Sequence, residues 1–447
     1  MRIAIVAEVF LPKVDGVVIR TMNLIRHLLE QGDEILVVTP SSMDRGECPV
    51  PILEFPSFPF LTYPEYRIGL PDERLTSTLR EFQPDLVHYL NPFAFGFRCH
   101  DWLERSGSHF PSLFSFHTVY GEFVKRYPLI RPLSGLLWWL MRDYHNQADL
   151  NLTVSALMLN ELRARGFQRV ELWPPAVNCE LFNPRQASFQ MRERLTCGHP
   201  DERLLVTVSR LAPEKNVSFL CEVIDRLPGT RLAIIGDGPD RAELERRFAG
   251  TKTAVFGYLQ GAELATAYAS ADAFVYASET ETMGNVVLEA MASGLGVVVP
   301  RAGGIPSLVN HQETGLLYSP RDPVDAVSAI RQLLDDADFN ARISHAARQT
   351  VEDWGWNRSI AHVREHYLAT IEMCRRTGGV PRERRWCGPV LTQMLVTAFR
   401  ALACVAGQRI TSGMTSVIPA TAPGIHYQEM LPTQGEIHGL RGNLART

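Results

Sequence analysis

The sequence lacks several patterns that would assign it to a common class of protein. Its eight cysteines form no Cys-x-x-Cys pair, so they indicate neither a zinc site nor a disulfide framework. No apolar run approaches the roughly 18 to 20 residues that a membrane-spanning helix requires. The N-terminus, MRIAIVAEVF, has one basic residue and is interrupted by Glu8, which is typical of a first strand and not of a signal peptide. We therefore expect a cytoplasmic protein with reduced thiols.

Composition and charge narrow the class further. The formal net charge is −4, which argues against a nucleic-acid-binding protein. The apolar fraction of 45% and the charged fraction of 21% are those of a soluble globular chain. At 447 residues the chain is too long for one ordinary core, so two domains are expected.

Apolar strands alternate with amphipathic helices over most of the chain. Residues 3–6 form a run typical of a strand buried in a parallel sheet, and a helix over 17–30 and a strand over 34–38 follow it. The connecting loop lacks the GxGxxG fingerprint, so a nicotinamide site is not indicated. We expect further strands over 85–90, 111–118, 148–154, 170–173, 204–208, 232–235, 253–256, 273–277 and 297–299. We expect further helices over 241–248, 262–270, 322–335, 339–351 and 357–375.

The stretch 278–306, SETETMGNVVLEAMASGLGVVVPRAGGIP, carries most of the functional information. It predicts an acidic loop, a helix over 284–293 that Gly294 ends, and a buried strand. A helix N-terminus beside Gly284 suits a phosphate, and the carboxylates of Glu281 and Glu289 suit sugar hydroxyls. From spacing alone, the alternative is that Glu281 caps the helix and Glu289 is a solvated helix residue.

Two basic residues follow the strand at 204–208. Arg210 and Lys215 are five residues apart in a turn, so they can converge on one anion such as a departing nucleoside diphosphate. No convincing Asp-x-Asp lies at a strand end, and two fixed cations would serve in place of a metal. Either residue alone is more often a surface charge.

Two further candidates stand at ends of strands in the first half. His117 ends the strand at 111–118, and in parallel sheets ligands lie off the carboxyl ends of the strands. Gly16 either lets backbone approach a ligand or simply makes a tight turn.

Two aromatic segments in the first half have alternative explanations. In 124–147 the basic residues Lys125, Arg126, Arg131 and Arg142 flank a tryptophan-rich run, which suits a membrane interface. The alternative is that Trp138 and Leu140 pack in the core. The proline-punctuated aromatic run at 50–72 cannot be a regular helix or a central strand. It is either a surface loop or an apolar edge at which Phe58, Phe60 and Leu61 contact an apolar partner.

The whole string from Glu281 to Glu289, with AMASG and GGIP after it, resembles the Glu-x7-Glu element of retaining, nucleotide-sugar-dependent glycosyltransferases. These enzymes have the GT-B fold and are of the glycosyltransferase family 4 type. Arg210 and Lys215 match their Arg-x4-Lys motif, and the resemblance covers about residues 1–375. Within the family, five strings resemble the sulfoquinovosyltransferases of sulfolipid synthesis: FLPKVDG (10–16), YPE (63–65), HNQA (145–148), GYLQG (257–261) and WGW (354–356).

The resemblance implies an α/β protein whose two Rossmann-like domains face a central cleft. Residues 1–175 would form the acceptor-side domain and residues 176–353 the nucleotide-sugar-binding domain. Residues 354–376 would be a crossover helix that returns to the first domain. Residues 377–447 would be a tail, and the richness of its end in Gly, Thr, Pro and Ser predicts disorder.

The resemblance also implies roles for the candidate residues. Arg210 and Lys215 would stabilise the diphosphate, Glu281 would hold sugar hydroxyls and Glu289 the ribose, and His117 would touch the sugar from the opposite domain. The implied nucleotide-sugar site further contains Gly16, Gly238, Met283, Gly284 and Asn285.

The implied reaction moves a sugar, with retention and without metal or cofactor, from a UDP- or GDP-sugar to a lipid acceptor at a membrane surface. Sulfoquinovose from UDP-sulfoquinovose to diacylglycerol fits best. The hinge departs from the family's usual Gly-Val-Asp after a basic residue, because residues 174–178 read PPAVN. This leaves open glucose, galactose or mannose donors, a UDP-sugar epimerase, or a non-catalytic nucleotide-sugar-binding protein.

Overall fold

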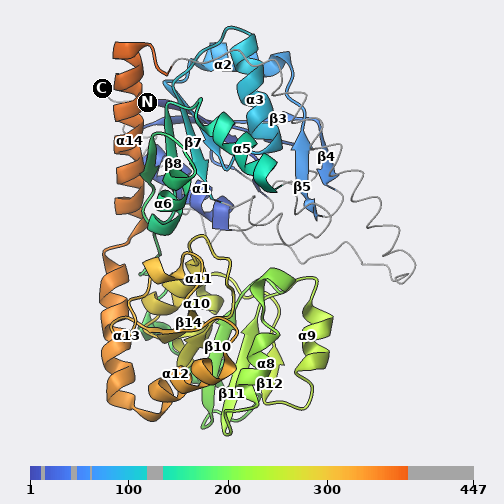
Figure 1. Ribbon diagram of the computed structural model, residues 1–447, viewed down its shortest axis with the longest axis vertical. Coiled ribbons are helices and arrows are strands. Elements are labelled where there is room, and N and C mark those ends of the chain that lie inside the picture. Colours follow the sequence, from blue (N-terminus) through green and yellow to red (C-terminus); the bar gives the residue numbers. More distant parts are fainter. Residues whose placement is uncertain (12–15, 42–47, 61–62, 118–133, 381–447) are drawn as a thin grey trace, which may run out of the picture.

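The computed structural model describes residues 1–11, 16–41, 48–60, 63–117 and 134–380. Within these residues two parallel sheets follow one another along the chain, each with helices against it, and they form the upper and lower halves of Figure 1. This is the α/β architecture of two Rossmann-like halves that the sequence predicts. The limits expected for the domains remain a prediction.

The first sheet has seven strands in the order β3-β2-β1-β6-β7-β8-β9. The central strand β1 is buried on both faces, with Ile3 and Ile5 in one apolar cluster and Ala4 and Val6 in another. The strands of this sheet are β1 (Arg2–Ala7), β2 (Glu34–Pro40), β3 (Ile52–Phe55), β6 (Leu86–Leu90), β7 (Ser112–Phe116), β8 (Leu150–Thr153) and β9 (Val170–Leu172). The helices of this half are α1 (Gly16–Glu30), α2 (Glu73–Phe82), α3 (Ala94–Arg105), α5 (Ser134–His145) and α6 (Ala156–Ala164).

The second sheet has six strands in the order β12-β11-β10-β13-β14-β15. Its strands are β10 (Arg203–Val208), β11 (Thr230–Ile235), β12 (Thr253–Val255), β13 (Ala273–Val275), β14 (Gly296–Pro300) and β15 (Leu316–Tyr318). Its helices are α7 (Phe189–Leu195), α8 (Phe219–Ile224), α9 (Arg241–Arg247), α10 (Gly261–Ala269), α11 (Asn285–Ala292), α12 (Pro323–Asp335) and α13 (Ala337–Glu352). Short 3-10 turns lie at Pro184–Gln186, Pro213–Lys215 (η3) and Ile305–Ser307.

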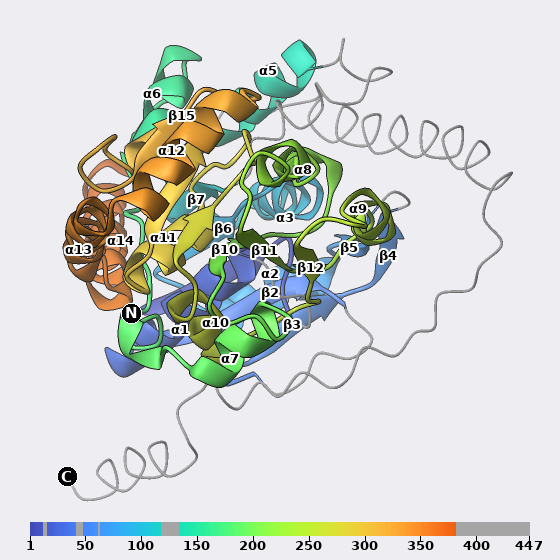
Figure 2. The same ribbon diagram turned by 90° about the horizontal axis from the view of Figure 1, so that it is seen from below.

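The last helix, α14 (Trp356–Thr377), returns to the first half. It continues along the side of the molecule on which α13 lies and ends beside the first sheet (Figures 1 and 2). Its buried residues Ile360, Val363 and Tyr367 belong to the same apolar cluster as Ile3 and Ile5. The core of the first half is therefore completed by a helix that follows the entire second half in the sequence.

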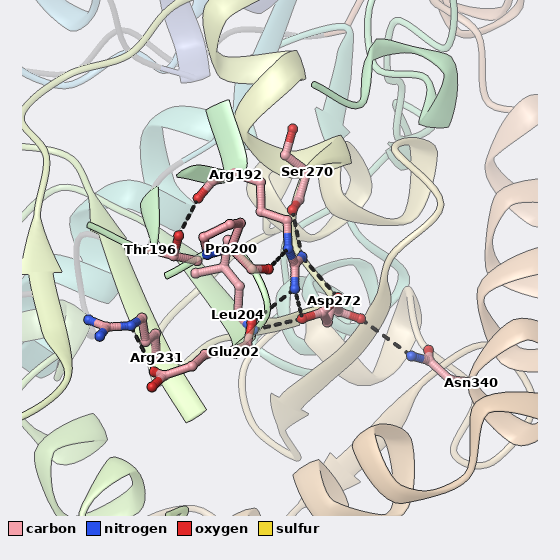
Figure 3. Close-up of polar contacts among 9 residues, drawn as sticks. All are labelled: Arg192, Thr196, Pro200, Glu202, Leu204, Arg231, Ser270, Asp272 and Asn340. Atoms are coloured by element: carbon pink, nitrogen blue, oxygen red, sulfur yellow. Dashed lines mark hydrogen bonds and ion pairs between the residues drawn. The ribbon is translucent and has the colours of Figure 1, made fainter. Parts of the chain in front are cut away.

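Arg192 of α7 fixes the start of the second half to its sheet (Figure 3). Its guanidinium binds both carboxylate oxygens of Asp272, at 2.9 and 3.0 Å, and donates to the carbonyls of Pro200, Glu202 and Ser270. The Asp272 carboxylate also accepts the Leu204 N–H, at the first buried residue of β10. The polar stretch after the hinge is thus a structured entry to the second half.

Sequence reasoning was incomplete at residues 50–72. The segment contains the edge strand β3 and an antiparallel pair, β4 (Ser57–Phe60) and β5 (Tyr63–Gly69), where we expected a surface loop or an apolar edge. Proline is compatible with an edge strand because one side of that strand needs no partner. The exclusion of a central strand was correct.

Candidate active site

The chain segments that leave the carboxyl ends of β7 and β13 contact each other, and some of the predicted site residues lie in or beside them. In the second half, the acidic loop after β13 carries Thr282, whose hydroxyl donates to the backbone carbonyl of His117 at 2.9 Å. His117 directly follows β7 of the first half. The structure thus brings His117 to the loop that holds Glu281, although they are far apart in sequence.

Glu281 does not cap the helix that follows it. The N-cap of α11 is Gly284, with φ +90° and no side-chain hydrogen bond, so no cap side chain covers the start of this helix. A Cβ at position 284 would lie 2.8 Å from Ile305 Cδ1, which adds a steric reason for glycine at this left-handed position. Met283 and Asn285 flank this turn, and Gly304 N–H holds it by donating to Glu281 O at 2.7 Å.

The Glu281 carboxylate is paired inside the site. Lys215 Nζ lies 2.5 Å from Glu281 Oε1, and Tyr276 OH donates to the same oxygen at 2.7 Å. Burial alone would raise the pKa of Glu281, but Lys215 and these hydrogen bonds hold it below its usual value. The carboxylate is therefore ionised at neutral pH and ready to accept hydrogen bonds.

Lys215 and Arg210 lie in the loop that leaves β10. Lys215 ends η3 and reaches the acidic loop through its contact with Glu281. Arg210 stands at the start of the same loop and is half-buried. Gly238 lies on the neighbouring loop after β11, where Leu211 N–H donates to Asp237 O at 2.9 Å.

Glu289 is half-buried in α11 and its carboxylate is hydrogen-bonded, which argues against the alternative of a fully solvated helix residue. Its Oε2 accepts a hydrogen bond from Tyr268 OH at 3.0 Å. Burial raises the pKa of Glu289 to about 7, and the Tyr268 hydroxyl opposes this only in part. The carboxyl group is therefore half-protonated near neutral pH.

His117 is a buried, neutral imidazole. Its Nε2 lies 2.9 Å from Ser115 Oγ, and its backbone N–H donates to Asn91 Oδ1 at 3.1 Å. Burial lowers the pKa of His117 well below its usual range, and the positive charge of Arg20 lowers it further. His117 can therefore exchange hydrogen bonds with a hydroxyl but does not supply a positive charge.

Gly16 is the first residue of α1 and touches the second half. A Cβ at this position would lie 2.9 Å from Asn285 Nδ2, so a larger residue would require this side chain to move. Gly16 thus lies close to the Asn285 side chain, and its approach to a ligand stays a prediction.

Sequence analysis missed Arg20, a buried cation between the halves. The residue is 1% exposed. Its Nη2 donates to Pro174 O at 3.1 Å and to Met283 Sδ at 3.3 Å, and the guanidinium lies 4.8 Å from the centre of the Trp173 ring. Burial lowers the pKa of Arg20 to about 9. The signal in the sequence was an arginine in register with Leu24 and Leu28 on the buried face of the helix.

The altered hinge is well ordered. Pro174 O accepts hydrogen bonds from Arg20 and from Ser359 Oγ at 2.7 Å. Asn178 makes a local turn by accepting the N–H groups of Glu180 and Leu181. The hinge sequence lacks a basic residue, and Arg20 of α1 places a positive charge beside Pro174 instead.

The tryptophan-rich helix α5 is divided between core and solvent. Trp138 and Leu140 are buried, whereas Leu136 and Trp139 are 40% and 43% exposed. Arg142 is half-buried, and its guanidinium donates to Arg165 O at 3.3 Å. Of the other residues predicted to meet a membrane, Phe58 packs against Ile68 and Ala94. Lys125, Arg126, Arg131, Leu61 and the side chain of Phe60 lie outside the part of the molecule that the structure describes.

The described residues contain neither a membrane-spanning helix nor a metal-binding cluster. No helix among them is both long and apolar enough to cross a bilayer. They contain no group of three or more His, Cys, Asp and Glu side chains placed to hold a metal ion. The expectation that no metal is required remains a prediction.

Two Rossmann-like halves that meet at the carboxyl ends of their strands define the GT-B class of glycosyltransferase. The chain matches the family model described as Glycosyltransferase Family 4 over residues 14–181, and that described as Glycosyl transferases group 1 over residues 202–336. The chain therefore belongs to the glycosyltransferases of the family 4 type, and it is a glycosyltransferase that uses a nucleotide-sugar donor.

Three relatives carry names with three different sugars. The sulfoquinovosyl transferase SQD2 of Arabidopsis thaliana is 38% identical over 81% of this chain and 72% of its own length. A GDP-mannose-dependent alpha-mannosyltransferase of Mycobacterium tuberculosis is 36% identical over 83% of this chain and 97% of its own. An alpha-monoglucosyldiacylglycerol synthase of Acholeplasma laidlawii is 26% identical over 77% of this chain and 92% of its own.

A solved structure supports the fold. The sucrose-phosphate synthase of Thermosynechococcus elongatus superposes with a TM-score of 0.68 over 83% of this chain and 99% of its own, at 21% identity. At that identity the likeness concerns the fold alone.

Proposed function

We propose that this chain transfers sulfoquinovose, with retention, from UDP-sulfoquinovose to diacylglycerol. The observation that carries the proposal is its 38% identity to a sulfoquinovosyl transferase over most of both chains. The arrangement of the candidate site is compatible with this reaction, because ionised and neutral hydrogen-bonding groups from both halves surround the contact between them.

In this proposal the diphosphate of the donor lies between the basic loop and the N-terminus of α11. Lys215 and Arg210 supply positive charge, and the uncapped N-terminus of α11 supplies hydrogen-bond donors. Lys215 already contacts Glu281, so the donor shares this lysine with the carboxylate. Two fixed cations and a helix end replace a metal ion.

Glu281 and His117 hold the sugar from opposite halves. The ionised Glu281, fixed by Tyr276, accepts hydrogen bonds from sugar hydroxyls. The neutral His117 accepts or donates one without adding charge. Glu289, when ionised, accepts hydrogen bonds from the ribose.

Retention follows if the acceptor hydroxyl attacks the anomeric carbon from the face that the diphosphate leaves. The bond from that carbon to the phosphate oxygen breaks as the bond to the acceptor oxygen forms. The proton of the acceptor hydroxyl passes to the departing phosphate oxygen, so no protein nucleophile is needed.

A lipid acceptor requires access to a bilayer surface, and the exposed Leu136 and Trp139 of α5 suit such an interface. The name of the Acholeplasma relative includes diacylglycerol, which supports the same acceptor here. We propose peripheral association through this helix and the basic segment before it.

A second candidate is mannosyl transfer from GDP-mannose. The mycobacterial relative that supports it is nearly as similar and is matched over almost its full length. The two candidates differ in base and in sugar charge, so one experiment separates them.

The test is incubation of the purified protein with diacylglycerol vesicles and, separately, UDP-sulfoquinovose, UDP-glucose, UDP-galactose and GDP-mannose. Mass spectrometry of the lipids should show sulfoquinovosyl diacylglycerol, and proton NMR should show an α-linkage, as in the donor. Lys215→Ala is the matched inactive control. Mannosyl lipid from GDP-mannose alone would replace the first candidate by the second.

A further inference from the structure

Arg20 carries a buried charge, and no acidic side chain in the described part of the chain pairs with it. Within the described residues, its partners are uncharged: the Pro174 carbonyl, the Met283 thioether and the aromatic rings of Trp173 and Trp356. Its Nη1 is buried and has no hydrogen-bond partner. A guanidinium in such surroundings is costly to bury, because buried charges are normally paired.

One of these contacts is easily replaced. The Nη2 of Arg20 donates to Met283 Sδ at 3.3 Å, and a thioether is a weak acceptor for a charged donor. An anionic oxygen is a far better partner, since hydrogen bonds between charged groups are about twice as strong as neutral ones. Met283 lies in the turn between Glu281 and α11, so displacing it opens Arg20 towards the donor.

The position of Arg20 favours the sugar end of the donor over its diphosphate. Its charge reaches His117, which the proposed function places at the sugar. Both residues belong to the first half, whereas Arg210 and Lys215, the proposed diphosphate cations, belong to the second. Glu281 and His117 themselves offer an anionic sugar only a carboxylate and a neutral ring.

We propose that Arg20 binds an anionic substituent on the donor sugar and thereby selects acidic sugars over neutral ones. A sulfonate or a carboxylate at carbon 6 would take the free Nη1 and displace Met283 from Nη2, so the planar fork binds two oxygens at once. This role rests on the proposed function, in which Arg20 is the residue that recognises the sulfonate of sulfoquinovose.

Calorimetry with four ligands tests the idea: UDP, UDP-glucose, UDP-glucuronate and UDP-sulfoquinovose. The wild type should bind the two acidic donors about tenfold to hundredfold more tightly than UDP-glucose, the range expected for hydrogen bonds to a charged group. Arg20→Met should remove this preference and leave the Kd of UDP within about threefold, the scatter tolerated for a residue outside the nucleotide site. Arg26→Met, on the same helix, is the matched control and should keep the preference.

Two outcomes overturn the proposal. If Arg20→Met weakens UDP as much as UDP-sulfoquinovose, the cation serves the diphosphate and not the sugar. If the preference survives in Arg20→Met, Arg20 only supports the hinge. If Arg20→Met does not fold, the affinities of the wild type test the proposal. Equal affinity for UDP-glucose and both acidic donors would contradict a cation that recognises the charge of the sugar.

The proposed function can fail separately. A wild type that prefers acidic donors yet makes no sulfoquinovosyl lipid would refute that function and leave the role of Arg20 intact. Formation of the lipid with an unchanged preference in Arg20→Met would do the reverse.

Discussion

At the scale of residues, Lys215 and Glu281 form an ion pair, and in the proposed function the donor binds to both of them. The lysine cannot give its full charge to the diphosphate while it neutralises the carboxylate. Loss of either residue therefore removes a contact to the donor. It also leaves the other residue largely buried and without its counter-charge.

Arg210→Ala and Lys215→Ala should each lower kcat/KM by more than tenfold, because one pre-organised electrostatic donor contributes about 3 kcal/mol. Thermal unfolding should confirm that both variants are folded. EDTA should leave the wild-type rate unchanged. Near-normal turnover in either variant, or activity that disappears with EDTA and returns with magnesium, would contradict the proposed roles.

The raised pKa of Glu289 predicts a pH-dependent donor affinity. Below its pKa of about 7 the carboxyl is protonated and loses part of its capacity to accept from the ribose hydroxyls. Affinity for UDP-glucose, measured by calorimetry, should therefore increase as pH is raised from 6 to 8, by up to about tenfold. Glu289→Gln should bind more weakly and lose this pH dependence. Glu281→Gln should keep it, because the pKa of Glu281 lies below its usual value.

The sequence motifs pointed to Glu281, Glu289, Arg210 and Lys215 as candidates, but not to Arg20 or to the tyrosines that bind the two carboxylates. Glu281 and Lys215 stand in motifs, so they could be named and even paired with a function. Tyr276 directly follows β13, and Tyr268 and Arg20 are helix residues; the contacts of all three depend on how separate elements pack. Only Arg20 carried a local signal, a charge on the buried face of α1.

At the scale of elements, the N-terminus of α3 is occupied by the protein itself. The carboxylate of Glu8, after β1, accepts four backbone N–H groups, those of Phe93, Ala94, Phe95 and Gly96. Burial raises the pKa of Glu8, although these four bonds oppose the shift. The anion-binding end of this helix therefore serves the fold and leaves no place for a phosphate.

Glu8→Ala should destabilise the protein by about 3 kcal/mol or more, because it leaves several buried donors without partners. Asp72→Ala is the matched control: Asp72 caps the exposed start of α2 with one backbone bond and should cost about 1 kcal/mol. Urea unfolding followed by circular dichroism measures both. Equal losses in the two variants would show that the buried cap is no more important than the exposed one.

The exposed side of α5 predicts a membrane contact. Leu136→Ser with Trp139→Ser should reduce flotation with anionic liposomes, and replacing Lys125, Arg126 and Arg131 with glutamate should abolish it at low salt. Phe189→Ser, which removes a 67% exposed side chain from the second half, should have no effect. UDP binding should be unchanged in all three. A wild type that ignores anionic liposomes at low salt would favour a soluble acceptor.

Elements could be predicted from sequence where their pattern was long and regular. Buried strands such as β1 and β14 and helices such as α12 and α13 were located to within about two residues, the usual uncertainty of element ends. The sequence analysis did not include α2, α3 and α6, which lie between better signals. The edge strand β3 was not predicted, because prolines flank it and because its pairing with β2 depends on tertiary structure.

At the scale of the whole molecule, α14 joins the two halves in one folding unit. Ile360, Val363 and Tyr367 fill the core beside β1, Arg364 binds Asp33 at 2.9 Å, and Tyr367 OH lies 2.6 Å from His88 Nδ1. A chain that stops after Val380 should fold and bind UDP like the full chain. One that stops after Asp353 should aggregate or unfold at least 10 °C lower in calorimetry, as expected when several buried apolar side chains are lost. Equal melting temperatures would contradict this.

The crossing of α14 also sets an order of events during synthesis. The last strand of the first sheet ends at Leu172, but the residues that close its core begin at Ile360. At about 5–20 residues per second, the ribosome needs roughly 10–40 s to make the chain between them. During that interval the second half can fold while the first still exposes the apolar face of β1. The nascent chain is thus most vulnerable to aggregation, and most in need of a chaperone, before its final helix emerges.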